Sequence, residues 1–170
     1  KNIIIRAHPP FQRIFLLHAD PSNTLEYDDI PDIEILEQFP SPDEWDGDCK
    51  SLLIIDDYDI KSLDKEQYKN MDRTFGYSST HKNLSVCITS QDSFNIPPIA
   101  RRCCNFFVFW KLLDLDALAT TARKTGLSSK TFAEIFEQLF NKRTDSLWID
   151  LTSHTPYPLR LNGFKKISLS

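Results

Sequence analysis

The chain has 170 residues, of which 41% are hydrophobic, and its formal net charge at pH 7 is −4. That length and apolar content fit one globular domain with a sizeable core. No apolar run approaches the roughly 20 residues that span a bilayer, and the amino end lacks a signal-peptide pattern, so we expect no membrane partner. The negative charge argues against a basic surface that coats nucleic acid, but it leaves room for a local basic patch.

The four cysteines constrain the compartment in which the chain works. Cys49, Cys87, Cys103 and Cys104 show no paired C-x-x-C spacing, and two adjacent cysteines rarely form a disulfide. We therefore expect reduced thiols, no zinc site among them, and a reducing intracellular compartment.

Residues 1–8 form the first predicted element, which Pro9 and Pro10 stop. No capping residue precedes it, so the sequence opens inside a helix or strand already under way. Short apolar runs then predict strands, and a run in which apolar and polar residues alternate is typical of an edge strand. These strands lie at residues 14–17, 33–36 (the alternating run), 51–59 and 84–89.

One helix is predicted between the last two of these strands. It covers residues 63–75, with Asp64 as its cap and Gly76 closing it. A polar loop follows at residues 78–83, and a proline-containing connection is expected at residues 95–102.

The second half of the chain opens with the aromatic run 106–110, which is the strongest strand signal in the sequence. Two helices follow, at residues 114–124 and 129–141, the second with apolar side chains at helical spacing. A last internal strand is expected at residues 147–151. The tail, residues 154–170, contains a short segment at 159–161 and is expected to pack along an edge, with an interaction arm as the alternative.

The order of these elements predicts the fold class. Strands alternate with helices and most strands are apolar throughout, which is typical of an α/β fold with a mostly parallel central sheet flanked by helices. The chain contains no internal repeat and no linker, so we expect a single domain over residues 1–170.

The stretch 51–59, Ser-Leu-Leu-Ile-Ile-Asp-Asp-Tyr-Asp, suggests the first chemistry. A buried strand that runs into two acids places them at the carboxyl edge of a parallel sheet, where such sheets bind ligands. This is the arrangement of a Walker B motif, in which Asp56 would hold Mg²⁺ and Asp57 would polarise the water that attacks a γ-phosphate. The alternative is a buried strand that ends in an Asp-rich turn.

Further polar residues fall near the same edge. Gln91 follows the strand 84–89, so it should lie beside the two acids if both strands are parallel, where it could orient the attacking water or sense the γ-phosphate. Arg101 and Arg102 precede the next strand, and one of them could reach a neighbouring subunit's nucleotide as an arginine finger. An ordinary loop amide and ordinary surface arginines are the alternatives.

Three segments together resemble the FtsK–HerA superfamily of viral genome-packaging ATPases, as found in large DNA viruses, virophages and Polinton-like elements. They are the apolar strand that ends in Asp56 and Asp57, the run His-Lys-Asn-Leu-Ser-Val-Cys-Ile-Thr-Ser-Gln at 81–91, and Ile-Pro-Pro-Ile-Ala-Arg at 96–101 followed by the aromatic strand that ends in Lys111. The resemblance extends over residues 13–164.

This resemblance implies a RecA-like P-loop NTPase core and an ATP-driven motor. It would work as a homo-oligomeric ring with nucleotide between subunits, moving double-stranded DNA into a preformed capsid with capsid or portal proteins as partners. ATP and Mg²⁺ would be its substrate and cofactor. Such viruses assemble in the host cytoplasm or nucleus, and the protein could also be carried in the virion.

The resemblance also assigns roles to individual residues. Asp56 matches the Mg²⁺-binding acid, Asp57 the catalytic acid and Gln91 the sensor amide. Arg101 stands where the family's arginine stands, which favours it over Arg102 as the finger. His81 and Asn83 match a loop near the nucleotide or the DNA channel, or they brace that loop structurally.

The sequence departs from the family because it contains no G-x-x-x-x-G-K-[ST] motif among its four glycines. The element at residues 1–8 resembles the end of the P-loop helix, so we expect the first strand and P-loop to precede Lys1. As written, the chain should bind ATP poorly.

Two other functions stay open: a P-loop-free structural or DNA-clamping subunit, and a cellular DNA translocase or helicase of the same superfamily. In a motor, DNA contacts should be mostly to phosphates and sensitive to salt. Basic candidates for these contacts are Lys82, Arg123, Lys124, Lys130, Lys142, Arg143, Lys165 and Lys166.

Overall fold

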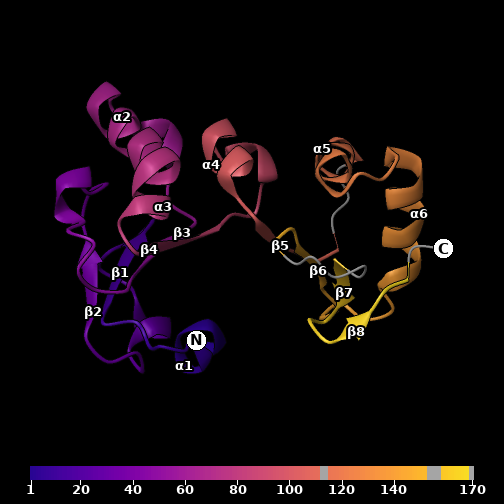
Figure 1. Ribbon diagram of the computed structural model, residues 1–170, viewed down its shortest axis with the longest axis horizontal. Coiled ribbons are helices and arrows are strands. Elements are labelled where there is room, and N and C mark those ends of the chain that lie inside the picture. The colour runs from indigo at the N-terminus through magenta and orange to yellow at the C-terminus, as the bar shows by residue number, and fades with distance from the viewer. Residues whose placement is uncertain (112–114, 153–157, 169–170) are drawn as a thin grey trace. The chain divides into compact units, whose positions relative to one another are not determined.

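In a computed structural model, the protein is described over residues 1–111, 115–152 and 158–168. The chain divides into two compact units, Lys1–Cys103 and Cys104–Ser170 (Figure 1). Each unit has its own four-stranded sheet and is described by itself below. The single ATPase domain over residues 1–170 stays a prediction.

The first unit is built on a parallel sheet with the strand order β2-β1-β3-β4. Its strands are β1 (Arg13–His18), β2 (Ile33–Leu36), β3 (Ser51–Asp56) and β4 (Leu84–Thr89). β2 is an edge strand, as its alternating sequence predicts. The two inner strands, β1 and β3, carry the unbroken apolar runs, because both of their faces are buried.

Alternate residues of the inner strands face two separate clusters. Phe15 and Leu53 pack on one face with Met71 and Phe75, whereas Leu16 and Leu52 pack on the other. The helix α1 (Asn2–Arg6) contributes Ile4 to the second cluster. The period of two along each strand thus supplies two layers of core, as predicted for a sheet flanked by helices.

The helix α2 (Lys65–Arg73) begins where the sequence predicts. The Asp64 carboxylate accepts the Gln67 backbone N–H at 2.8 Å, and the Gln67 side-chain oxygen accepts the Asp64 backbone N–H. Together these two hydrogen bonds form a capping box. The prediction that Gly76 closes this helix is wrong. A π-helical turn, Thr74–Ser78, passes through Gly76 and leads into α3 (Ser79–His81), because Gly76 does not adopt the positive φ of a helix-ending glycine.

The connection 95–102 also differs from the prediction, because it contains the short helix α4 (Pro98–Cys103). Pro98 occupies the first helical position, where the fixed φ of proline is favourable and its missing N–H costs nothing. Short 3₁₀ turns occupy Leu25–Tyr27, Pro42–Glu44, Ile60–Ser62 and Ser93–Asn95.

The second unit has an antiparallel sheet with the order β5-β6-β7-β8. Two helices, α5 and α6, supply the other side of its core: Ala122, Phe132 and Phe136 pack with Leu147 and Ile149. The elements are β5 (Phe106–Phe109), α5 (Leu115–Thr125), α6 (Ser129–Leu139), β6 (Leu147–Asp150), β7 (Leu159–Leu161) and β8 (Lys165–Lys166).

The strands of this unit are antiparallel, whereas the sequence predicts a mostly parallel sheet and does not indicate which strands depart from it. β7 and β8 are joined by a tight turn at Asn162 and Gly163, which both have positive φ, and the Phe164 N–H donates to the Leu161 carbonyl at 3.2 Å. Such a turn can only connect antiparallel neighbours. In the described part of the chain, no helix has the length and apolar character needed to cross a bilayer.

Candidate functional site

The candidate site lies at the carboxyl edge of the parallel sheet in the first unit. β1, β3 and β4 end side by side there, with His18 paired in register to Asp56 and Asp56 to Thr89. The chain turns immediately after β3, so Asp57 has a φ of 46°, which is uncommon for a residue other than glycine. Polar side chains from three strand ends therefore meet at one place.

Asp57 and Gln91 are joined by two hydrogen bonds. The Gln91 backbone N–H donates to Asp57 Oδ1 at 3.2 Å, and the Gln91 side-chain amide donates to Oδ2 at 2.9 Å. The structure thus brings together the two residues that parallel pairing of β3 and β4 predicts to be neighbours. Both side chains are exposed, so each Asp57 oxygen keeps a lone pair for a further donor.

Asp56 is held more tightly than Asp57. The Thr89 hydroxyl donates to Oδ1, and the Tyr27 hydroxyl donates to Oδ2 at 2.6 Å. Burial raises the pKa of Tyr27, and its bond to Asp56 raises it further, so the phenol stays protonated and remains a donor. The two hydroxyls fix the direction in which this carboxylate points.

His18 and Glu26 complete the surroundings of Asp56, and sequence reasoning missed both. His18 Nε2 lies 3.7 Å from Asp56 Oδ2 and 3.5 Å from Glu26 Oε1. His18 ends β1, one position beyond the predicted strand, whereas Glu26 belongs to the 3₁₀ turn Leu25–Tyr27. A signal for His18 existed: like Asp56, it directly follows an apolar run of a predicted parallel strand.

Arg101 lies on α4, with its guanidinium carbon 6.0 Å from the centre of the Phe94 ring. The structure thus places Arg101 in the first unit, which also holds Asp56 and Asp57. Arg102 follows it on the same helix and is exposed.

The segment 81–83, which begins with the last residue of α3, has contacts that brace it. The His81 ring stacks on Tyr77 at 4.5 Å, and its Nδ1 lies within hydrogen-bond distance of the Thr80 hydroxyl and the Tyr77 carbonyl. Asn83 has a φ of 49°, and its carbonyl accepts the Ser51 N–H at the start of β3. These contacts favour the structural alternative for both residues.

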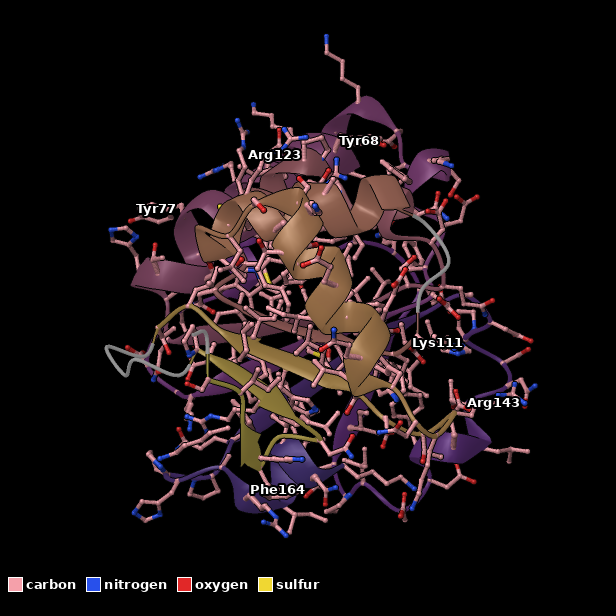
Figure 2. All side chains as sticks on the ribbon, turned by 90° about the vertical axis from the view of Figure 1, so that its right-hand side faces the viewer. Tyr68, Tyr77, Lys111, Arg123, Arg143 and Phe164 are labelled. Carbon is pink, nitrogen blue, oxygen red and sulfur yellow. The ribbon has the colours of Figure 1, made fainter. Side chains whose placement is uncertain are left out.

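The basic candidates for DNA contact are divided between the two units. Lys82 belongs to the first unit, and its ammonium donates to the Asp46 carbonyl at 3.4 Å. Arg123 and Arg143 belong to the second unit and are exposed (Figure 2). Lys124 lies over the Phe107 ring at 5.2 Å. Their roles stay predictions.

Comparison with known proteins gives structural neighbours alone. No protein-family model and no curated protein matches the chain. The genome-packaging NTPase B204 of Sulfolobus turreted icosahedral virus 2, solved with ATPγS, is 14% identical with a TM-score of 0.60, covering 93% of this chain and 84% of B204.

A second neighbour is B204, the DNA-packaging ATPase of Sulfolobus turreted icosahedral virus, which is 13% identical with a TM-score of 0.58. The match covers 98% of this chain and 87% of that protein. Identities this low show a shared fold. The chain thus has the α/β fold of these NTPases, with a four-stranded parallel sheet flanked by helices, as its sequence predicts.

Proposed function

We propose that this chain belongs to an ATP-driven motor that moves double-stranded viral DNA into a preformed capsid. The observation that carries the proposal is the contact between Asp57 and Gln91, beside Asp56, at the carboxyl edge of the parallel sheet. Support comes from the fold shared with B204, whose structures hold ATPγS and AMPPCP. An acid pair and an amide at this edge are among the groups that act in hydrolysis of a γ-phosphate.

The residues fit a magnesium ion. The Asp56 carboxylate offers the oxygen ligands that Mg²⁺ prefers, and its two hydroxyl donors leave each oxygen a lone pair. Asp56 would hold the ion directly or through water. When bound, the ion would neutralise charge on the nucleotide's phosphates.

Asp57 and Gln91 would act on the attacking water. The Asp57 carboxylate is exposed and accepts a hydrogen bond from the Gln91 side-chain amide. Its remaining lone pairs can accept an O–H from the attacking water, and the carboxylate can then take up the proton. Gln91, held through both its backbone and its side chain, would fix the angle of that carboxylate. The positive φ of Asp57 ends the extended backbone of β3 at this position.

Arg101 would act on a neighbouring subunit. In a ring of identical subunits, each Arg101 would lie at the next subunit's nucleotide and stabilise the charge of the transition state. Motion of DNA through such a ring would depend on contacts to phosphates and would weaken as salt rises. Capsid or portal proteins would be further partners, in the host cell cytoplasm or nucleus.

The test is ATP hydrolysis by the full-length protein with and without double-stranded DNA. We expect Arg101→Ala to lower DNA-stimulated turnover by about 10³-fold or more, as removal of an arginine finger does. Arg102→Ala is the matched control, because it removes the same charge one residue away, and it should retain activity. Equal activity in both variants would contradict the trans role of Arg101.

Gln91→Ala should lower turnover by about 10²-fold, since a misplaced Asp57 loses much of its general-base contribution. Near-normal turnover in Gln91→Ala would contradict the proposed site. Tight assembly with a separate ATPase, together with no effect of Asp56→Ala, would identify a structural or DNA-clamping subunit instead. Filled capsids in the absence of the protein would point to a cellular translocase.

A further inference from the structure

A cluster of three side chains lies beside the proposed hydrolysis site: His18, Glu26 and Asp56. The proposed hydrolysis uses Asp56 and gives no role to the other two. One nitrogen and two carboxylate oxygens, each from a different side chain, all lie within 4.8 Å of one another. We propose that these three side chains bind a divalent first-row transition ion such as Mn²⁺. The proposal rests on the proposed function only in sharing Asp56, because binding of the ion can be measured without nucleotide.

The separations of the ligand atoms suit an ion between them. His18 Nε2 lies 3.5 Å from Glu26 Oε1 and 3.7 Å from Asp56 Oδ2. Both distances exceed that of a good N–H···O hydrogen bond, so the three groups face one another without closing a direct contact. Adjacent ligands at about 2.2 Å from an octahedral ion lie about 3.1 Å apart, so each of these two pairs would close by about 0.4–0.6 Å when the ion binds.

Two of the three ligands are already oriented by neighbours. His18 Nδ1 lies 2.9 Å from the Asp20 carbonyl oxygen and 3.0 Å from the Asp20 backbone nitrogen, so the Asp20 backbone holds the ring with Nε2 facing the two carboxylates. An ion would bind the tautomer whose proton is on Nδ1, where the Asp20 carbonyl can accept it. The hydroxyls of Thr89 and Tyr27 hold Asp56. Such outer contacts around an imidazole and a carboxylate are typical of metal sites.

The third ligand is adjustable. The Glu26 side chain is 64% exposed, compared with 15% for His18 and 20% for Asp56. Glu26 is therefore free to close over an ion from the solvent side. Three protein ligands leave the remaining positions of an octahedral ion for water or a substrate oxygen.

The imidazole decides which ion the cluster prefers. Mg²⁺ favours oxygen ligands in octahedral geometry, whereas Mn²⁺ and later ions accept nitrogen together with carboxylates. The cluster should therefore select transition ions over Mg²⁺. The competing explanation is a protonated His18 that simply bridges two carboxylates, in which case no ion is needed.

The test is a titration of the full-length protein with Mn²⁺ alone, followed by the loss of the free-ion EPR signal. We expect one Mn²⁺ per chain, retained in about tenfold excess of Mg²⁺. Glu26→Gln should weaken binding by about tenfold or more. Because Glu26 is exposed and the replacement has the same shape, this variant should fold normally.

Asp28→Asn is the matched control, since it removes an equally exposed acid two residues from Glu26 and should bind Mn²⁺ as the natural chain does. His18→Ala should lose binding, and its circular dichroism spectrum will show whether it folds. Absence of Mn²⁺ binding, equal binding by Glu26→Gln and Asp28→Asn, or displacement by equimolar Mg²⁺ would overturn the site. Mn²⁺ binding without ATP hydrolysis would contradict the proposed function but leave this site standing.

Discussion

The two units use acidic residues in opposite ways. In the second unit, Asp145 is buried and accepts three hydrogen bonds, from the N–H groups of Asn141 and Lys142 and from the Asn162 amide, at 2.8–3.0 Å. In the first unit, Asp57 is exposed and its described partner is Gln91 alone. An acid whose oxygens are saturated stabilises a turn, whereas one with lone pairs facing solvent can bind and react.

The two sheets also differ in where their strands carry polar residues. All of β3 except its last residue is buried, because both faces are covered, so its polar residues appear only where the strand ends. In β6 buried and half-buried residues alternate, so polar contacts are spread along the strand and its flanks. A parallel sheet thus concentrates its chemistry at one edge, and an antiparallel sheet does not.

Core truncations should show the largest effects and will test whether both cores are formed as described. Leu53→Ala in β3 and Ile149→Ala in β6 remove side chains that are 0% exposed, and each should lower the free energy of unfolding by about 2–5 kcal/mol. Chemical denaturation measures this loss. Ile35→Ala, at an edge position that is 40% exposed, is the control and should cost less than about 1 kcal/mol. An equally small loss in Ile149→Ala would show that the second core is not packed as described.

Glycine substitutions at two asparagines with positive φ should separate the backbone contribution to stability from the side-chain contribution. Asn162→Gly should cost about 1–3 kcal/mol, because the Asn162 side chain also accepts the Ser146 N–H and donates to Asp145. Asn83→Gly should change stability by less than about 0.5 kcal/mol, since glycine suits its backbone and the structure describes no side-chain hydrogen bond there. Thermal unfolding compares them, and equal losses would contradict the distinction.

Helix caps offer a smaller, matched test in each unit. Asp64→Ala removes the cap of α2, and Ser128→Ala removes that of α6, where the Ser128 hydroxyl accepts the Thr131 N–H at 3.1 Å. Each should cost about 1 kcal/mol. Asp64→Asn and Ser128→Asp keep a capping oxygen and should restore most of the stability. A neutral alanine variant would show that the helix start is held by other contacts.

The smallest effect is confined to acid pH. The Asn162 amide, followed by the Lys142 N–H, holds the pKa of Asp145 below its ordinary value of 3.8. Because the folded-state pKa is the lower one, the stabilisation is complete above the ordinary value and is lost as pH falls through the folded value. Thermal midpoints of the natural chain and Asp145→Asn should therefore differ at neutral pH and converge in acid. A constant difference across this range would contradict the assignment.

Burial on both faces explains what the sequence could predict. The strands β1 to β4, the Asp64 cap and the proximity of Asp57 to Gln91 follow from apolar runs and the acids that end them. Unbroken apolar segments have few alternatives once they belong to a parallel sheet. The helices α5 and α6 follow from helical spacing in the same way.

What the sequence could not supply is long-range pairing. The antiparallel second sheet depends on which strands meet, although the Asn-Gly pair at 162–163 was a local signal for its last hairpin. The cluster around Asp56 depends on Tyr27 and Glu26, which belong to the polar connection after β1 and are distant from Asp56 in the sequence. Nothing local to those residues marks them as neighbours of a carboxylate 29 or 30 positions away.

The most direct test of the account is a single-turnover measurement on the full-length Asp57→Asn variant with labelled ATP, Mg²⁺ and double-stranded DNA. If Asp57 activates the attacking water, the variant should bind ATP about as well as the natural protein but cleave it about 10²- to 10⁴-fold more slowly. Cleavage at a near-normal rate would contradict the claim that this edge of the parallel sheet is the catalytic centre.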